Sequence, residues 1–211
     1  MSSSRFEELE KRIEELRECF LPESFDPTGL YEEKVYEHTR AFRVLAHAEF
    51  ESFIEDRVIE AVDQAIQAWE SEGFISKSLL AVVAYRESTP SIPGSLSEAA
   101  AKRDRFPTLD ARIKAARTDF YRYARNQNNG IKEKNLLRLL LPVGFSEDEF
   151  EAEWLSATET WATARGDAAH QAAKMQVQPD PQNELKTVRL VLDGFRDLND
   201  QLVSKSSARP V

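Results

Sequence analysis

The chain has 211 residues, of which 31% are charged and 41% are hydrophobic, and its net charge at pH 7 is −9. These proportions are typical of a globular domain with one apolar core. The single cysteine excludes an internal disulfide, and the three scattered histidines argue against a structural zinc site. No apolar stretch reaches the roughly 18 residues that cross a bilayer, and the first residues lack an apolar signal core. We therefore expect a cytoplasmic protein with no membrane segment, metal or cofactor.

Apolar residues recur at helical spacing from the beginning of the chain. Between Phe6 and Phe20 they follow a 3-4-3-4 pattern, which predicts an amphipathic helix with a narrow apolar seam. Two heptads are too short for a stable isolated coiled coil, so we expect this helix to dock on the body or on a second copy. A turn-rich connection at 21–29 leads into a helical pattern that runs without Gly or Pro from Tyr31 to Trp69.

Shorter helical segments occupy the rest of the chain. The pattern predicts helices at 78–85, 109–125, 132–141 and 183–203, with a loop at 88–95 and a break at 126–130. Residues 146–149 resemble a capping box, which predicts that the helix carrying Arg165 and His170 begins there.

No segment has the period of a strand, so the predicted fold class is all-α, a bundle of long antiparallel helices. The predicted boundaries give an N-terminal amphipathic helix with its connection (1–30), a helical bundle (31–204) and a disordered tail (205–211).

Basic residues gather in one region of this acidic chain. Between Lys102 and Arg138, 11 basic residues are opposed by only four acidic ones. One interpretation is a solvated helix face, and the other is a strip that follows an RNA backbone while nearby aromatic rings stack on bases. On the second interpretation the candidate RNA-binding residues are Arg112, Arg117, Arg122, Arg125, Lys132 and Lys134.

Arg165 and His170 place a permanent cation near the one side chain type that titrates close to neutral pH. Five residues along a helix is about 140° of rotation, so the two side chains would flank a groove. Cleavage of RNA by its own 2′-hydroxyl uses a base and an acid, and two copies of the chain would supply two imidazoles at a symmetric cleft. Arg165 would hold the phosphate and stabilise the charge of the transition state, and no metal is needed.

A second pair deserves comparison. Arg40 and His47 lie seven residues apart, which places them on nearly the same helix face. His47 stands among apolar residues, so the sequence favours an interior histidine whose hydrogen bonds are satisfied. The alternative is a catalytic group that Glu49 or Glu51 orients.

Three stretches, at 46–55, 128–145 and 165–170, occur in an order that resembles the RiboL-PSP-like branch of the HEPN superfamily. These are all-α domains that include many microbial ribonucleases, and the third stretch fits their signature of Arg, four to six residues, and His. The likeness covers about residues 34–172. It departs from the family pattern at Gly166, where a polar residue often follows the arginine.

The resemblance implies a helical bundle that dimerises and forms a composite, metal-independent endoribonuclease site with Arg165 and His170 from both copies. Asp167, His47 and Glu51 are candidate supporting residues. Single-stranded RNA is the implied substrate, and many relatives act in toxin–antitoxin or anti-phage systems, so an antitoxin or another defence protein is an implied partner. The alternatives are a HEPN module that binds RNA or a partner protein without catalysis, and a structural helical adaptor.

Overall fold

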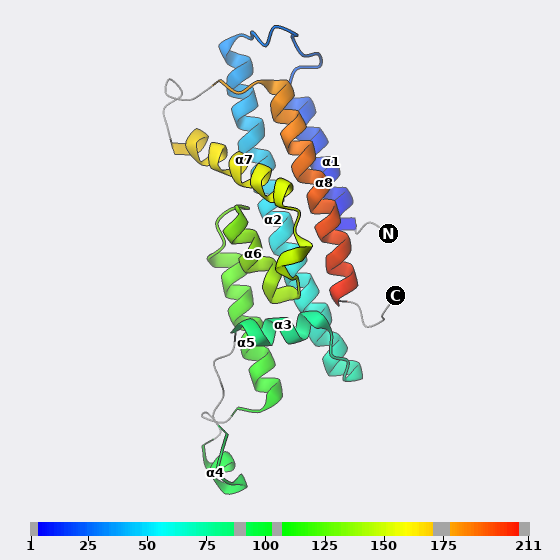
Figure 1. Cartoon of the computed structure of the whole chain (residues 1–211), viewed down its shortest axis with the longest axis vertical. Helices are drawn as coiled ribbons and strands as arrows, with labels where there is room; N and C mark the ends of the chain where they lie inside the picture. The colour runs from blue at the N-terminus through cyan, green and yellow to red at the C-terminus, as the bar shows by residue number, and fades with distance from the viewer. Residues whose placement is uncertain (1–3, 87–91, 103–106, 171–177, 207–211) are drawn as a thin grey trace.

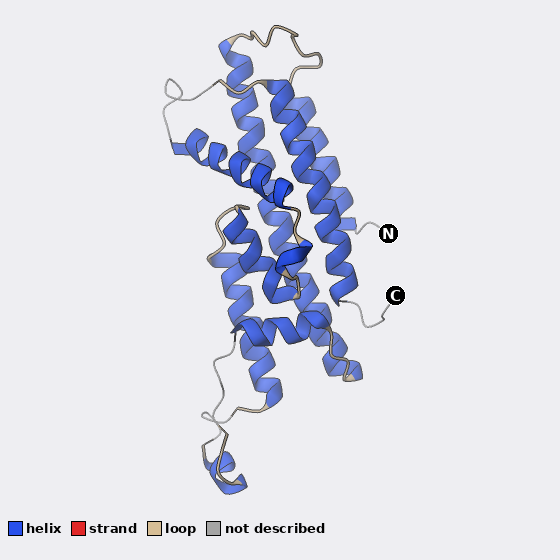
Figure 2. Cartoon of the chain, in the orientation of Figure 1, coloured by secondary structure: helices blue, strands red, loops and turns tan. Residues whose placement is uncertain are grey.

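The protein is helical throughout the part that is described. The computed structural model describes residues 4–86, 92–102, 107–170 and 178–206, except the side chains of Arg86 and of residues 166–170. Within these ranges there are α-helices and two short 3-10 helices and no strand, which confirms the all-α prediction (Figure 2). The helices are α1 (Ser4–Phe20), α2 (Glu33–Glu72), α3 (Lys77–Arg86), α4 (Leu96–Ala101), α5 (Leu109–Asn126), α6 (Glu133–Leu140), η1 (Leu141–Val143), η2 (Glu147–Glu149), α7 (Ala152–His170) and α8 (Pro181–Ser206).

The longest helix, α2, is the axis of the bundle. Helices α1 and α8 lie along one side of it, α5 lies along its C-terminal half, and α7 crosses it (Figure 1). Both α1 and α5 run antiparallel to α2, whereas α8 runs parallel to it (Figure 1). Because α2 is covered on several sides, its buried residues occur on more than one face of the helix. It ends at Gly73, whose φ of 67° is a left-handed conformation that glycine adopts without strain.

Aromatic side chains join α7 and α8 to α2. The ring of Phe50 lies 4.9 Å from that of Phe195 and 5.8 Å from that of Trp161, measured between centroids. Trp154 contacts the other side of Phe195, at 5.8 Å. These four side chains are almost fully buried. The crossing point of α7 over α2 is therefore fixed by close aromatic packing.

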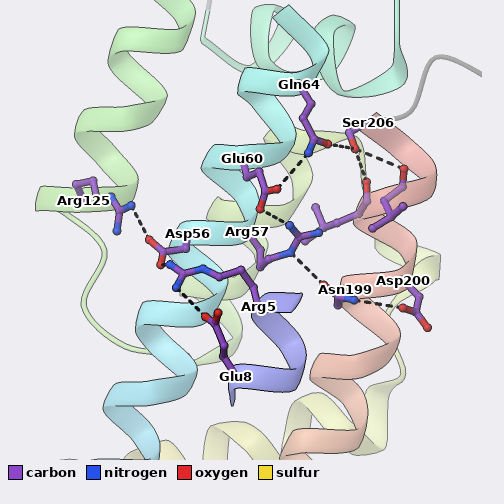
Figure 3. A network of polar contacts seen from close by, with 12 residues as sticks. Arg5, Glu8, Asp56, Arg57, Glu60, Gln64, Arg125, Asn199, Asp200 and Ser206 are labelled. Atoms are coloured by element: carbon purple, nitrogen blue, oxygen red, sulfur yellow. Dashed lines mark hydrogen bonds and ion pairs between the residues drawn. The ribbon is translucent and has the colours of Figure 1, made fainter. Parts of the chain in front are cut away.

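A buried polar network sets the position of α8 along α2 (Figure 3). The Arg57 Nε donates to Asn199 Oδ1 at 3.0 Å, and the same guanidinium pairs with Glu60. Arg57 and Asn199 are buried, so a shift of α8 would break the hydrogen bond between them where water cannot replace it. Near the end of α8, the Ser206 hydroxyl bonds to Gln64 Oε1 at 3.1 Å.

The start of α7 differs from the sequence prediction. The capping box is present, since the Ser146 N–H donates to Glu149 Oε2 at 2.6 Å, but it encloses only the 3-10 turn η2. Phe150 is extended, with φ −100° and ψ 130°, so the chain leaves the turn before α7 begins at Ala152. The capping signal was thus assigned to the wrong helix.

Two further boundaries differ. The short helix α4 was not predicted, and it begins where Ser95 Oγ accepts a hydrogen bond from the Glu98 N–H. Helix α8 continues through Ser206, two residues into the segment 205–211 for which the sequence favours disorder. Ser206 is buried and its hydroxyl donates to the Leu202 carbonyl at 3.0 Å, which fixes this last turn. Residues 207–211 lie outside the described residues.

Replacing Gly194 with alanine should destabilise the protein by about 1–3 kcal/mol, although alanine is the better helix former. A β-carbon at this position of α8 would collide with the indole of Trp154. Urea denaturation measures the effect. Because the collision is with Trp154, the same change in a Trp154→Leu background should cost less, and an equal cost in both backgrounds would contradict this explanation.

Candidate functional site

Arg165 lies in the last part of α7. The side chain is half-buried, and its Nε is buried with no hydrogen-bond partner among the described residues. The Nε of Arg40 on α2 also lacks a partner, but Arg40 holds Glu37 at 2.8 Å and Arg57 holds Glu60, whereas Arg165 has no ion pair with a described residue. The backbone of α7 continues to His170. The side chains of His170 and Asp167 lie outside the described part. Their roles therefore stay predictions.

His47, on α2, is interior but not satisfied. Its side chain is 3% exposed, and Nδ1 is buried without a hydrogen-bond partner in the described residues. The imidazole lies against the indole of Trp161, one turn before Arg165 on α7, with centroids 5.8 Å apart. The sequence prediction of an interior histidine is thus right about its burial and wrong about its hydrogen bonding.

Two carboxylates on the same face of α2 hold the connection between α5 and α6. Glu51, one turn after His47, accepts a hydrogen bond from the Gly130 N–H. Glu55, one turn further, accepts from Asn128 Nδ2 at 2.8 Å. Gly130 has a φ of 108°, and a β-carbon there would stand 3.4 Å from His47 Cε1. The positive φ favours glycine, and its Cα side packs against the imidazole at van der Waals distance, so this connection lies over the ring.

The other predicted partners of His47 point elsewhere. Glu49 pairs with Arg12 of α1 at 3.0 Å, so it does not orient the imidazole. Arg40 is held by Glu37 and, at 3.4 Å, by Glu33.

Charges and burial keep His47 neutral at pH 7. Burial lowers its pKa, and the positive charges of Arg165 and Lys132 lower it further, to about 4. Glu51 Oε2 lies 3.7 Å from Nδ1, but the carboxylate is engaged by the Gly130 N–H. Burial and the two cations outweigh it, so the pair is not a salt bridge at neutral pH. The pKa of Glu55 is raised, chiefly by burial.

Three of the six candidate residues in the predicted basic strip are paired with acidic neighbours. Arg117 pairs with Asp63 at 2.7 Å, Arg122 pairs with Asp119 at 3.0 Å, and Arg125 pairs with Asp56 (Figure 3). Arg112 donates to the Pro107 carbonyl. For Lys132 and Lys134 there is no ion pair within the described ranges. The prediction that the strip binds RNA stays open, with these two lysines as its least neutralised members.

The structure thus brings Arg165, Lys132, His47 and Glu51 to one place, where α2, α7 and the α5–α6 connection meet. Sequence reasoning missed Trp161, Asn128 and Gly130 as parts of this place. Two signals were available for Asn128 and Gly130, the turn cluster at 126–130 and the stretch 128–145 that carries the family resemblance, and neither indicates what the turn covers. A neutral imidazole beside two cations that have no ion pair among the described residues favours binding of an anion.

Within the described ranges, no group of three or more His, Cys, Asp or Glu side chains is arranged to hold a metal. No helix among the described residues has the length and apolar character that crossing a membrane requires.

The chain was compared with known proteins. No curated protein and no solved structure matches it. The family model for RiboL-PSP-HEPN domains matches residues 7–204, a range that includes most of α1 and every element of the site described above. Whether the chain divides at residue 30 stays a prediction, although α1 shares the apolar core of the bundle. The match covers nearly the whole chain, and the protein therefore belongs to the RiboL-PSP-HEPN family.

Proposed function

We propose that the protein is a metal-independent endoribonuclease that cuts single-stranded RNA, with Arg165 and His170 as catalytic residues. The observation that carries the proposal is Arg165, a half-buried cation whose Nε has no partner among the described residues and which stands beside a neutral imidazole. Family membership supports a nuclease or RNA-related role. An antitoxin or another defence-system protein is the partner that such a nuclease would need, and the cytoplasm is its proposed compartment.

The reaction needs a proton acceptor, a proton donor and a holder for the phosphate. A base takes the proton of the 2′-hydroxyl, the 2′-oxygen bonds to phosphorus, and the 5′-oxygen leaves with a proton from an acid. The products are a 2′,3′-cyclic phosphate and a 5′-hydroxyl. Arg165 would hold the phosphate oxygens through charge-assisted hydrogen bonds, which strengthen as charge develops in the transition state.

A second copy would complete the site, because one His170 cannot accept and donate a proton at the same moment, as attack and departure in a single concerted step require. HEPN domains commonly dimerise. An open groove of about 910 Å³ runs between α7 and α8 and is lined by Trp161 and by the small side chains of Ala157 and Ala164. Small residues beside Arg165 leave room for a helix of a second copy to approach closely, which supports a composite site.

The first test is cleavage by the purified full chain in excess EDTA. We expect single-stranded RNA to be cut, and the products to carry 2′,3′-cyclic phosphate ends that a phosphatase removes only after acid opening. Activity should follow the main protein peak in gel filtration. Products with linear 3′-hydroxyl ends, or activity that EDTA abolishes, would show that the proposed chemistry is wrong.

A second candidate function is RNA binding without cleavage. Gly166 favours it, because the resemblance places a polar orienting residue directly after the arginine and this chain has none there. On this alternative RNA binds with measurable affinity, no product forms at any protein concentration, and affinity survives Arg165→Ala and His170→Ala.

A further inference from the structure

Two cations that have no ion-pair partner among the described residues lie near His47. Arg165 comes from α7, and Lys132 is the residue directly before α6. Both are half-buried, and their charges reach the imidazole strongly enough to lower its pKa. Half-buried cations lose part of their hydration, and an anion from outside that binds both would compensate this loss.

Lys132 is held in this position by its neighbours. The Gly130 N–H is bound to Glu51, and Asn128 is bound to Glu55 and, through its Oδ1, to Asn135 Nδ2 at 3.1 Å. On the other side, the Glu133 N–H donates to Glu159 Oε2 of α7 at 2.8 Å. The backbone around Lys132 is thus fastened to α2 on one side and to α7 on the other. Such a residue is preorganised for a ligand between these helices.

The buried polar side chain next to Arg165 and Lys132 is His47. His47 Nδ1 is buried and has no hydrogen bond within the described ranges, although Glu51, the nearest acceptor, lies at 3.7 Å. Glu51 and Glu55 are fastened to the α5–α6 connection by hydrogen bonds, and within the described residues neither forms an ion pair with Lys132 or Arg165.

The inference rests on the proposed function. We propose that Lys132 and His47 complete, together with Arg165, an anion subsite that holds a phosphodiester group of single-stranded RNA. The guanidinium and the ammonium donate to the non-bridging oxygens, and the imidazole closes the subsite from below. The bound anion compensates the two positive charges that disfavour a proton on His47, so the ring becomes easier to protonate when the subsite is filled.

The test uses a ligand that cannot be cut, so that binding is measured apart from catalysis. The probe is the dinucleotide UpU with a 2′-O-methyl group, titrated into the ¹⁵N-labelled full chain while the imidazole signals are followed by NMR. We expect the His47 signals to move with the ligand. Lys132→Gln should raise the dissociation constant about tenfold, the effect of losing one hydrogen bond to a charged group.

The matched control is Lys34→Gln, which removes the same charge from an exposed position in the first turn of α2 and should change the dissociation constant less than twofold. The methylphosphonate analogue of the probe, which lacks the negative charge, should bind weakly to every variant. Equal losses for the two lysine variants, or His47 signals that ignore the ligand, would overturn the subsite. Specific binding by a protein that never cleaves RNA would sustain the subsite and refute the proposed nuclease. Cleavage of RNA together with equal losses of affinity for the two lysine variants would support the nuclease and refute the subsite.

Discussion

Replacing His170 with alanine should lower the rate of RNA cleavage by about 10²–10⁴-fold, because the change removes a group that transfers protons in the transition state. Replacing Arg165 with alanine should cost about 10²–10³-fold, since it removes charge stabilisation of the phosphate. Arg165→Lys should recover only part of this loss, because lysine keeps the charge but loses the paired donors of the guanidinium. Initial rates on a fluorogenic single-stranded RNA, under subsaturating conditions, measure all three variants.

The control for His170→Ala is His38→Ala. His38 lies near the start of α2 against Phe20, with ring centroids 6.1 Å apart, and no step of the proposed reaction uses it. Its replacement should leave the rate within twofold of the wild type. If His170→Ala cleaves as fast as His38→Ala, the assignment of His170 is wrong.

Mixing tests whether two copies share the site. When wild-type chain is refolded with an excess of His170→Ala chain, most wild-type protomers are paired with the variant. A composite site then lacks one of its two imidazoles, so activity per wild-type chain should fall with the excess. Activity that stays constant at every mixing ratio would show that each copy cleaves alone.

The sequence was sufficient for the fold because the pattern of apolar residues decides which helices form. The seam from Phe6 to Phe20 and the long run from Tyr31 predict α1 and α2 closely. The boundaries that failed depend on local hydrogen bonds whose extent the sequence does not reveal. Ser146 and Glu149 make the capping contact that their types predict, but the extended Phe150 ends the turn before α7 can begin.

The site was harder to predict because its parts are far apart in the chain and meet through packing. Glu51 and Gly130 are 79 residues apart, and no periodicity indicates that the backbone of one binds the carboxylate of the other. The chemistry of His47 likewise depends on burial and on cations from two other segments, Lys132 and Arg165. Sequence reasoning identified these three residue types as candidates but could not place them together. In the opposite direction, counting positive charges overstated the basic strip, because carboxylates on α2 neutralise Arg117 and Arg125.

The buried His47 should make the protein lose stability as the pH falls from about 6.5 toward 4. The folded protein keeps this imidazole neutral until its lowered pKa of about 4, whereas in the unfolded chain it takes a proton near 6.5. In this window the unfolded state binds more protons than the folded state. The free energy of unfolding therefore decreases as the pH is lowered. At pH 4.5 the contribution is about 2–3 kcal/mol, and above pH 6.5 it vanishes. The groups that face the imidazole and set this window are Arg165 on α7, Lys132 before α6 and Glu51 on α2.

Urea denaturation of the wild type and of His47→Gln at pH 7.0 and pH 4.5 isolates the effect. Glutamine does not titrate, so the variant should lose about 2–3 kcal/mol less than the wild type between the two pH values, whatever its stability at pH 7.0. The other carboxylates titrate in both proteins, and the comparison cancels them. His38→Gln is the matched control and should keep the wild-type loss. Equal losses of unfolding free energy for wild type and His47→Gln would mean that the imidazole is hydrated or paired in the folded protein. The anion subsite would then lack the neutral ring on which it depends.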